Sequence, residues 1–202
     1  MLTLALIRHG ETDWNRERRV MGWGPISINA EGRAQVERLA ERLSAAPIRA
    51  IYTSPLPRTA DSAALLAKPL GLTPIPDERW IETKITGWEG KLWSELAGHP
   101  IRASYYTAPT ETRLPGGEIF AEVQQRTVAA VEELRQRHSS ECVAVVSHAD
   151  PIRAVLSHYL GQPLSASRHI RIDHATLSIL ELDGATVSLR LLNAPPELVR
   201  LP

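Results

Sequence analysis

Short apolar runs alternate along this chain with longer segments of helical periodicity. The runs are LTLALI at 2–7, IRAIYTS at 48–54 and CVAVVSHA at 142–149. Strand-like runs separated by helices are typical of βαβ units, whose successive strands lie parallel in one sheet. The run at 142–149 lacks alternation, as expected for a central strand buried on both faces. The rhythm predicts an α/β fold: a three-layer sandwich with a mostly parallel central sheet flanked by helices.

Four segments carry the spacing or the end signals of helices, at about 29–45, 57–70, 119–137 and 150–160. Asn29 can cap the first of them. At the 3.6-residue period, the inner face of this first helix is expected to hold Val36, Leu39, Ala40 and Leu43. The inner face of the third is expected to hold Phe120, Val123, Thr127, Val131 and Leu134.

The end of the chain shows a different pattern. TLSILEL and TVSLRLLN flank Asp183 and Gly184, which is a hairpin turn signal. We therefore expect the sheet to acquire an antiparallel edge strand near the C-terminus.

Periodicity is poor between 74 and 118, where prolines, glycines and tryptophans are frequent. A long irregular insertion inside a compact domain is usually functional, so we expect this one to cover a pocket. Whether its aromatic residues Trp80, Trp93, Tyr105 and Tyr106 face that pocket is open. Because no repeat or linker interrupts the chain, we expect residues 1–202 to form one domain.

The charges balance, with 23 basic and 23 acidic residues, which removes any global argument for nucleic acid or an anionic membrane as partner. Cys142 is the single cysteine and lies in an apolar run, so we expect a core residue. We find no signal-peptide pattern and no apolar run near the roughly 18 residues that a membrane helix needs. These features predict a cytoplasmic protein without a nucleic-acid or membrane partner, and they leave the oligomeric state open.

Charged and titratable side chains follow three of the predicted strands. Arg8 and His9 end the first, Arg58 comes soon after the second, and His148 ends the third. Ligands of open α/β sheets bind beyond the carboxyl ends of the strands, so these residues can converge there. Guanidinium groups fit phosphate oxygens two at a time, and a neutral imidazole can attack phosphorus. The sequence therefore predicts a phosphate site with histidine as a possible nucleophile.

The histidines give little support for a metal site. They lie at 9, 99, 138, 148, 158, 169 and 174, without HExxH, His-x-His or a cysteine cluster. We therefore expect no metal cofactor. His138 and His158 fall on predicted helices and are expected to be solvated or packed. For His169 and His174, near a strand end, a pocket role and an ordinary one stay equally open.

Several ordered motifs together resemble the histidine phosphatase superfamily, whose members include cofactor-dependent phosphoglycerate mutases. They are LIRHGETDWN at 6–15, GW at 22–23, NAEGRAQ at 29–35, IYTSPLPRT at 51–59, GWEG at 87–90, GGE at 116–118 and VVSHADPIRAVL at 145–156. The resemblance covers most of the chain up to about residue 160.

The resemblance implies roles for five residues. His9, in the Arg-His-Gly motif, would be the nucleophile that becomes phosphohistidine, with Arg8, Arg58 and His148 around the phosphoryl oxygens. Asn15 would donate a further hydrogen bond to phosphate. We expect His148 to work as a cation and His9 to start neutral, so that two neighbouring histidines differ in protonation.

A leaving alkoxide needs a proton, so a carboxylic acid is expected near the bridging oxygen. The region 77–90 offers Asp77, Glu78, Glu82 and Glu89. The family's spacing points to Glu82 as the donor, with Glu89 as the alternative. Thr86 stands where the family has a glycine, which leaves the path of the loop after Glu82 open.

Three functions fit this sequence. The resemblance implies that mutases of the family carry a tyrosine and then paired arginines after the catalytic Glu, to hold a second anionic group. Here Ile85 and Trp93 stand in that region, and no Arg-Arg pair occurs between 83 and 118. This favours a metal-independent phosphomonoester hydrolase acting on a small metabolite, similar to the broad-specificity or α-ribazole phosphatases. The alternatives are a mutase, which would need 2,3-bisphosphoglycerate as cofactor, and a non-catalytic phosphate-binding module.

Overall fold

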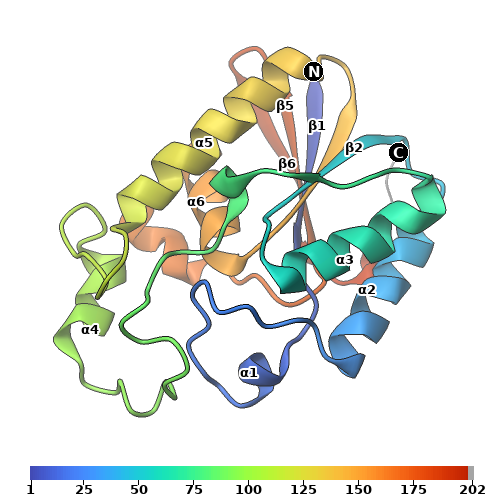
Figure 1. The fold of residues 1–202 in the computed structure, drawn as a ribbon. Coiled ribbons are helices and arrows are strands. Elements are labelled where there is room, and N and C mark those ends of the chain that lie inside the picture. The colour runs from blue at the N-terminus through green and yellow to red at the C-terminus, as the bar shows by residue number, and fades with distance from the viewer. Residues whose placement is uncertain (200–202) are drawn as a thin grey trace.

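The computed structural model describes residues 1–199, and a six-stranded sheet is its centre (Figure 1). The strands are β1 (Leu2–Arg8), β2 (Ile48–Thr53), β3 (Ile75–Pro76), β4 (Cys142–Ser147), β5 (Leu177–Asp183) and β6 (Thr186–Ala194), in the order β3-β2-β4-β1-β5-β6. The first four in this order pair in parallel, whereas β5 is antiparallel to both β1 and β6. The predicted fold class is confirmed, and the antiparallel part consists of a two-stranded hairpin.

Helices cover both faces of the sheet (Figure 1). They are α1 (Asp13–Arg16), α2 (Ala30–Leu43), α3 (Pro57–Ala67), α4 (Pro100–Thr107), α5 (Phe120–Arg137) and α6 (Ala149–Tyr159). Asn29 caps α2 by accepting a hydrogen bond from Gly32 N, 2.8 Å away. The predicted second helix ends early, and residues 68–70 form a 3-10 turn, because Pro69 cannot donate the next helical hydrogen bond.

The absence of alternation in β4 follows from its two covered faces. Val143 and Val145 pack with α5 and α6, whereas Ala144 and Val146 pack with α2 and α3. All the inner-face residues expected for the first and third helices are buried. Two apolar layers thus fix the sheet, and the carboxyl ends of β1, β2 and β4 lie at one edge of it.

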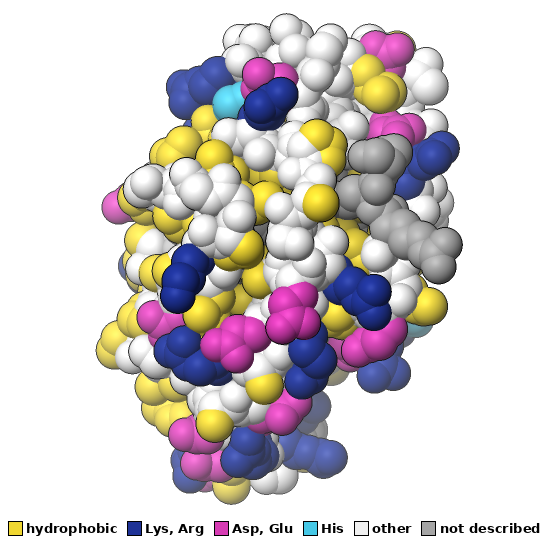
Figure 2. Space-filling model, turned by 90° about the vertical axis from the view of Figure 1, so that its right-hand side faces the viewer, with side chains coloured by type: hydrophobic (Ala, Val, Ile, Leu, Met, Phe, Trp, Pro, Cys, Tyr) yellow, Lys and Arg dark blue, Asp and Glu magenta, His cyan; other side chains and the backbone are white. Residues whose placement is uncertain are grey.

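The insertion at 74–118 contains β3, α4 and a 3-10 turn at 78–80, and it packs over the end of the sheet. Trp88, Tyr105 and Leu114 form a third apolar cluster with Phe120 and Val123 of α5. Trp80 is fully buried in the core beside α5 and α6, so it does not face the pocket. Cys142 is also buried, as expected. On the face that Figure 2 shows, acidic and basic side chains are interspersed, in keeping with the balanced charge of the chain.

The turn after β1 is shaped by two glycines in direct contact. A Cβ atom on Gly10 would lie 2.4 Å from the carbonyl oxygen of Gly32, and one on Gly32 would lie 2.1 Å from that of Glu11. The first turn of α2 therefore packs backbone to backbone against the segment that follows His9. Asn29 adds a hydrogen bond from Nδ2 to Glu11 Oε1 at 2.9 Å.

We predict that Gly32→Ala lowers the free energy of unfolding by about 1–3 kcal/mol, because the new methyl group must displace backbone. Chemical denaturation measures the change. Glu37→Ala on the exposed face of α2 is the control and should alter stability by less than about 0.5 kcal/mol. Equal stability of Gly32→Ala and the parent protein would contradict this description of the turn.

Candidate active site

The structure brings together the four residues that follow the strands. Arg8 ends β1 and His9 follows it, His148 caps α6 directly after β4, and Arg58 lies in the first turn of α3. The rings of His9 and His148 have centroids 5.3 Å apart, and Arg58 Nε lies 3.2 Å from His148 Nδ1. His9, Arg58 and His148 are each 0% exposed. The predicted convergence at the sheet edge therefore exists.

The hydrogen bonds of His9 determine its tautomer. Its Nδ1 lies 2.7 Å from the carbonyl oxygen of Gly10, which can only accept, so Nδ1 carries the proton. Its Nε2 is buried and has no hydrogen-bond partner among residues 1–199. Burial, with Arg58 and Arg8 nearby, keeps the pKa of His9 well below 6.5. Nε2 therefore holds a free lone pair at neutral pH.

His148 is also neutral in the free site, in contrast to the cation we expected. Arg58 Nε donates to its Nδ1, and its Nε2 lies 2.8 Å from Ser54 Oγ. Burial and the Arg58 charge hold the pKa of His148 well below 6.5. A cationic His148 would need a bound anion to offset these effects.

The two arginines stay charged although burial lowers the pKa of each to about 10. Arg58 donates to Gly22 O at 2.7 Å and to Gly24 O at 3.0 Å, which fixes the 22–24 loop over the site. Arg8 donates to Ile172 O at 2.7 Å, while its Nε is buried without a partner in the described chain. Both groups thus retain donors for an anion.

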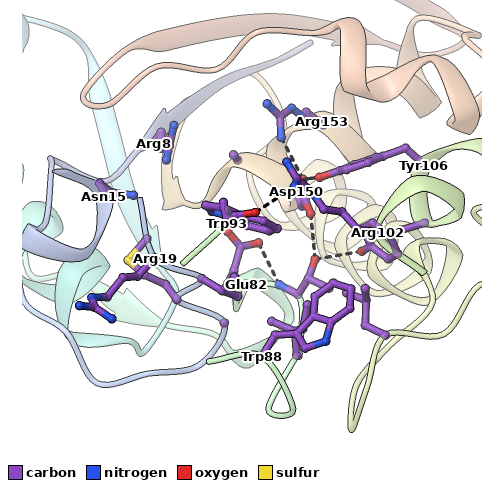
Figure 3. A pocket seen from close by; sticks show the side chains of 18 residues that line it. Arg8, Asn15, Arg19, Glu82, Trp88, Trp93, Arg102, Tyr106, Asp150 and Arg153 are labelled. Atoms are coloured by element: carbon purple, nitrogen blue, oxygen red, sulfur yellow. Dashed lines mark hydrogen bonds and ion pairs between the residues drawn. The ribbon is translucent and has the colours of Figure 1, made fainter. Parts of the chain in front are cut away.

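A pocket of about 240 Å³ opens beside this cluster (Figure 3). The predicted site residues Arg8, Asn15 and Glu82 line it, whereas His9, Arg58 and His148 lie buried and are not part of the lining. Asn15 Oδ1 accepts from Thr12 N at 3.1 Å and Thr12 Oγ1 at 3.0 Å, so its amide nitrogen is left as a donor.

Four aromatic residues line the same pocket: Trp88, Trp93, Tyr105 and Tyr106. Trp88 also packs within the insertion and is 4% exposed. The sequence left open whether the aromatic residues of the insertion face the pocket. Trp93, Tyr105 and Tyr106 do so. The insertion is therefore a pocket wall.

Glu82 has the environment of a proton donor. Its Oε1 accepts a hydrogen bond from Thr83 N at 2.9 Å. Burial and the neighbouring Asp150 raise the pKa of its carboxyl to about 7, against the effect of Arg58 and Arg8. Glu89, the alternative donor, instead accepts from Trp23 N at 2.7 Å and does not line the pocket.

Hydrogen bonds fix the loop after Glu82, although Thr86 stands where the family has a glycine. Thr86 Oγ1 donates to Gly116 O at 3.1 Å, and Lys84 N donates to Glu118 Oε2 at 2.9 Å. A Cβ atom on Gly117 would lie 1.7 Å from Lys84 O, so this contact requires glycine. The GGE segment thus anchors the loop.

Sequence reasoning missed two residues of the site. Asp150 and Arg153 line the pocket, and their position in the first turns of the helix after His148 was the available signal. For His174, whose role the sequence left open, the ring lies 5.8 Å from that of His9, and burial and Arg8 lower the pKa of His174 to about 3.

The other histidines lie away from the pocket lining. His138 is packed, with Nε2 2.9 Å from the Tyr52 hydroxyl, and both His158 and His169 are exposed. Within residues 1–199 we find no group of three or more His, Cys, Asp or Glu side chains placed to hold a metal ion. None of the described helices combines the length and the apolar character needed to cross a membrane.

Two cations and an imidazole with a free lone pair lie beneath a pocket, with a carboxyl group of raised pKa beside them, which is the arrangement that phosphoryl transfer requires. The family model of the histidine phosphatase superfamily (branch 1) matches residues 4–195. The chain therefore belongs to this superfamily, as its motifs indicated.

Named relatives include phosphatases and mutase-like proteins. The chain is 34% identical to phosphoserine phosphatase 1 of Hydrogenobacter thermophilus over 91% of this chain and 88% of the relative. It is 31% identical to a probable phosphoglycerate mutase GpmB of Serratia proteamaculans, over 88% and 84%. The solved structure of Bacillus stearothermophilus YhfR is 32% identical, has a TM-score of 0.89 and covers 96% of this chain and 98% of its own. The phosphatase class predicted from sequence agrees with these findings.

The tautomers can be tested in the free enzyme by NMR of ¹³C,¹⁵N-labelled histidine. We predict that His9 appears as the Nδ1–H form and His148 as the Nε2–H form, and that both are neutral at pH 6.5, because the pKa of each lies well below this value. His9→Asn and His148→Asn assign the two signals. A titration of either ring near pH 6.5 would contradict the assignment.

Proposed function

We propose that the enzyme hydrolyses phosphomonoesters of small metabolites through a covalent phosphohistidine on His9, without a metal ion. The observation that carries this proposal is the buried, unpartnered Nε2 lone pair of His9 beside two charged arginines. The Glu82 carboxyl, whose pKa is raised to about 7, supports the assignment of a proton donor. The relatives named as phosphatases support the reaction class.

The first step transfers the phosphoryl group to the enzyme. His9 Nε2 attacks phosphorus in line with the ester bond, and the bond between phosphorus and the bridging oxygen breaks. Glu82 gives its proton to the departing alkoxide, so that the alcohol leaves neutral. Arg8, Arg58 and Asn15 would donate hydrogen bonds to the three non-bridging oxygens, where charge is spread in the transition state.

The second step reverses the proton transfer. The ionised Glu82 takes a proton from a water molecule, whose oxygen attacks phosphorus and breaks the bond to His9 Nε2. Inorganic phosphate and the neutral imidazole are released. A bound phosphoryl dianion would offset the Arg58 charge and raise the pKa of His148, so we propose that His148 becomes the expected cation only with substrate.

The pocket wall indicates the kind of leaving group. Trp88, Trp93, Tyr105 and Tyr106 present aromatic surface to the pocket, which suits an alcohol with an apolar or planar part. Phosphoserine and phosphoglycerate, which appear in the names of relatives, are also candidate substrates.

A cytoplasmic location and the absence of nucleic-acid and membrane partners stay predictions.

A mutase remains the second candidate because of the GpmB relatives. A screen of phosphorylated metabolites separates the two, with phosphoserine and with 3-phosphoglycerate in the presence and absence of 2,3-bisphosphoglycerate. Release of inorganic phosphate from a monoester, without added metal and in EDTA, supports the hydrolase. Isomerisation of 3-phosphoglycerate that depends on the bisphosphate supports the mutase, and turnover of neither kind supports a binding module.

We predict that His9→Ala lowers kcat for p-nitrophenyl phosphate by on the order of 10³-fold or more, because the variant lacks the imidazole that attacks phosphorus in the proposed mechanism. The variant should also lose the acid-labile phosphoenzyme that rapid quenching traps in the parent protein. His158→Ala, an exposed change on α6, is the control and should retain activity. A phosphoenzyme in His9→Ala would exclude His9 as the nucleophile.

We predict that Glu82→Gln slows hydrolysis of an alkyl phosphate by about 10²–10⁴-fold and slows that of p-nitrophenyl phosphate much less. The physical reason is that p-nitrophenolate leaves without a proton, whereas an alkoxide does not. Glu89→Gln, at the alternative carboxylate, should change both rates equally. Equal slowing of the two substrates by Glu82→Gln would count against the donor role.

A further inference from the structure

A second carboxylate lines the pocket beside Glu82. Asp150 is the second residue of α6, two positions after His148, and its side chain is 14% exposed. Figure 3 shows it between Glu82 and Arg153, at the centre of a chain of hydrogen bonds. The two-step reaction proposed above uses only one carboxyl group, so the presence of Asp150 calls for a separate explanation.

The side chain of Asp150 is fixed by hydrogen bonds to both of its oxygens. Its Oδ1 accepts hydrogen bonds from the Tyr106 hydroxyl at 2.8 Å and from an Arg153 terminal nitrogen at 3.0 Å. Its Oδ2 accepts from Thr83 Oγ1 at 3.4 Å. Donors from α4, from α6 and from the residue after Glu82 therefore meet at this side chain, and the one from Arg153 is cationic.

Thr83 connects this carboxylate to Glu82. Its backbone N–H donates to Glu82 Oε1 at 2.9 Å, and its hydroxyl donates to Asp150. The Tyr105 hydroxyl donates to the same Thr83 oxygen at 3.3 Å, which leaves the Thr83 proton directed at Asp150. Thr83 is buried, so this connection lies away from bulk water.

We propose that Asp150 is a positioning residue for the phosphatase reaction: it orients the Glu82 carboxyl through Thr83 and, by its charge, keeps that carboxyl protonated until the alkoxide leaves. The proposal rests on the proton-donor role proposed above for Glu82. Asp150 itself touches neither phosphorus nor the leaving oxygen in this scheme. Its charge keeps the Glu82 carboxyl in the acid form, although the other charges of the site are positive.

The need for such a residue follows from the surroundings of Glu82. Arg8 and Arg58 both favour an ionised Glu82, which could not donate a proton. Burial and the Asp150 charge act in the opposite direction and together raise the pKa of Glu82 to about 7. The charged or titratable groups around the two carboxyl groups are Arg8 of β1, Arg58 of α3, Tyr105 and Tyr106 of α4, Arg126 of α5 and Arg153 of α6.

The sign of the effect on rate follows. A carboxyl group with a raised pKa is an acid below that pKa and loses the proton above it, so transfer to an alkoxide declines as the pH rises through about 7. Removal of the Asp150 charge lowers the pKa of Glu82 and moves this decline to lower pH. If this decline moves to lower pH by about one unit, kcat/KM for an alkyl phosphate falls roughly tenfold at pH 8.

The test is the pH profile of kcat/KM between pH 5 and 9 for an alkyl phosphate and for p-nitrophenyl phosphate. We expect Asp150→Asn to move the alkaline limb of the alkyl phosphate to lower pH, while the rate with p-nitrophenyl phosphate at its optimum changes by less than about threefold. Asp150→Glu restores the charge and should return the limb toward that of the parent. Glu111→Gln, an exposed acid of the insertion, is the matched control and should leave both profiles unchanged.

Thr83→Val tests orientation apart from charge. It removes the hydroxyl and keeps the Asp150 carboxylate. We therefore expect kcat for the alkyl phosphate to fall severalfold, while the alkaline limb of the pH profile stays at the same pH. An unchanged rate would overturn the orienting role.

An alkaline limb that is unchanged in Asp150→Asn would overturn the role of the charge. Asp150→Ser makes the same measurement with a smaller neutral side chain, should the Asn variant not fold. If the parent protein and Glu82→Gln have the same pH profile with the alkyl phosphate, the donor role of Glu82 is overturned instead, which separates the two failures.

Discussion

The buried guanidinium group of Arg58 joins the parts of the site. It reaches from the first turn of α3 to the carbonyl oxygens of Gly22 and Gly24 and to Nδ1 of His148. A fully buried cation is costly unless it is hydrogen-bonded, and these three acceptors from two other segments meet that requirement. The loop over the site, the strand-end histidine and the helix after β2 are therefore placed by the same side chain. The charge of Arg58 can be buried only when these segments are folded around it and supply the acceptors.

Burial has the largest effect on protonation in the site, and the positive charge of Arg58 adds to it or opposes it. This charge helps to keep His9 and His148 neutral, and it acts against the acid form of Glu82. A nucleophile must be neutral and a proton donor must be protonated, so the two requirements conflict in a cationic environment. The carboxylate of Asp150 resolves the conflict locally, because it lies on the Glu82 side of the pocket.

Much of this arrangement could be predicted from the sequence. The β-α alternation predicted the sheet, and the positions of Arg8, His9, Arg58 and His148 after strands predicted where they would meet. Periodicity also identified the buried faces of α2 and α5. Glu82 was selected by spacing relative to a family motif, and the structure places it in the pocket lining.

Other features depend on contacts between distant segments, for which the sequence has no local pattern. Tyr106 and Asp150 are 44 positions apart and meet only because α4 packs against α6. The tautomer of His148 depends on the direction of one Arg58 N–H, and the closeness of His174 to His9 depends on the turn before β5. The buried position of Trp80 likewise follows from tertiary packing rather than from its irregular surroundings.

The contact between Lys84 and the GGE segment separates the insertion into two parts. Glu118 binds Lys84 N, receives Arg126 of α5 at 3.0 Å and so fixes the base of the insertion to the domain. Residues 85–115 project from this clasp and carry most of the aromatic wall. Substitutions, and even changes of length, in the projecting part could alter which alcohol fits while Glu82 stays in register with the phosphate. The architecture thus allows selectivity to diverge among related chains at little risk to the chemistry.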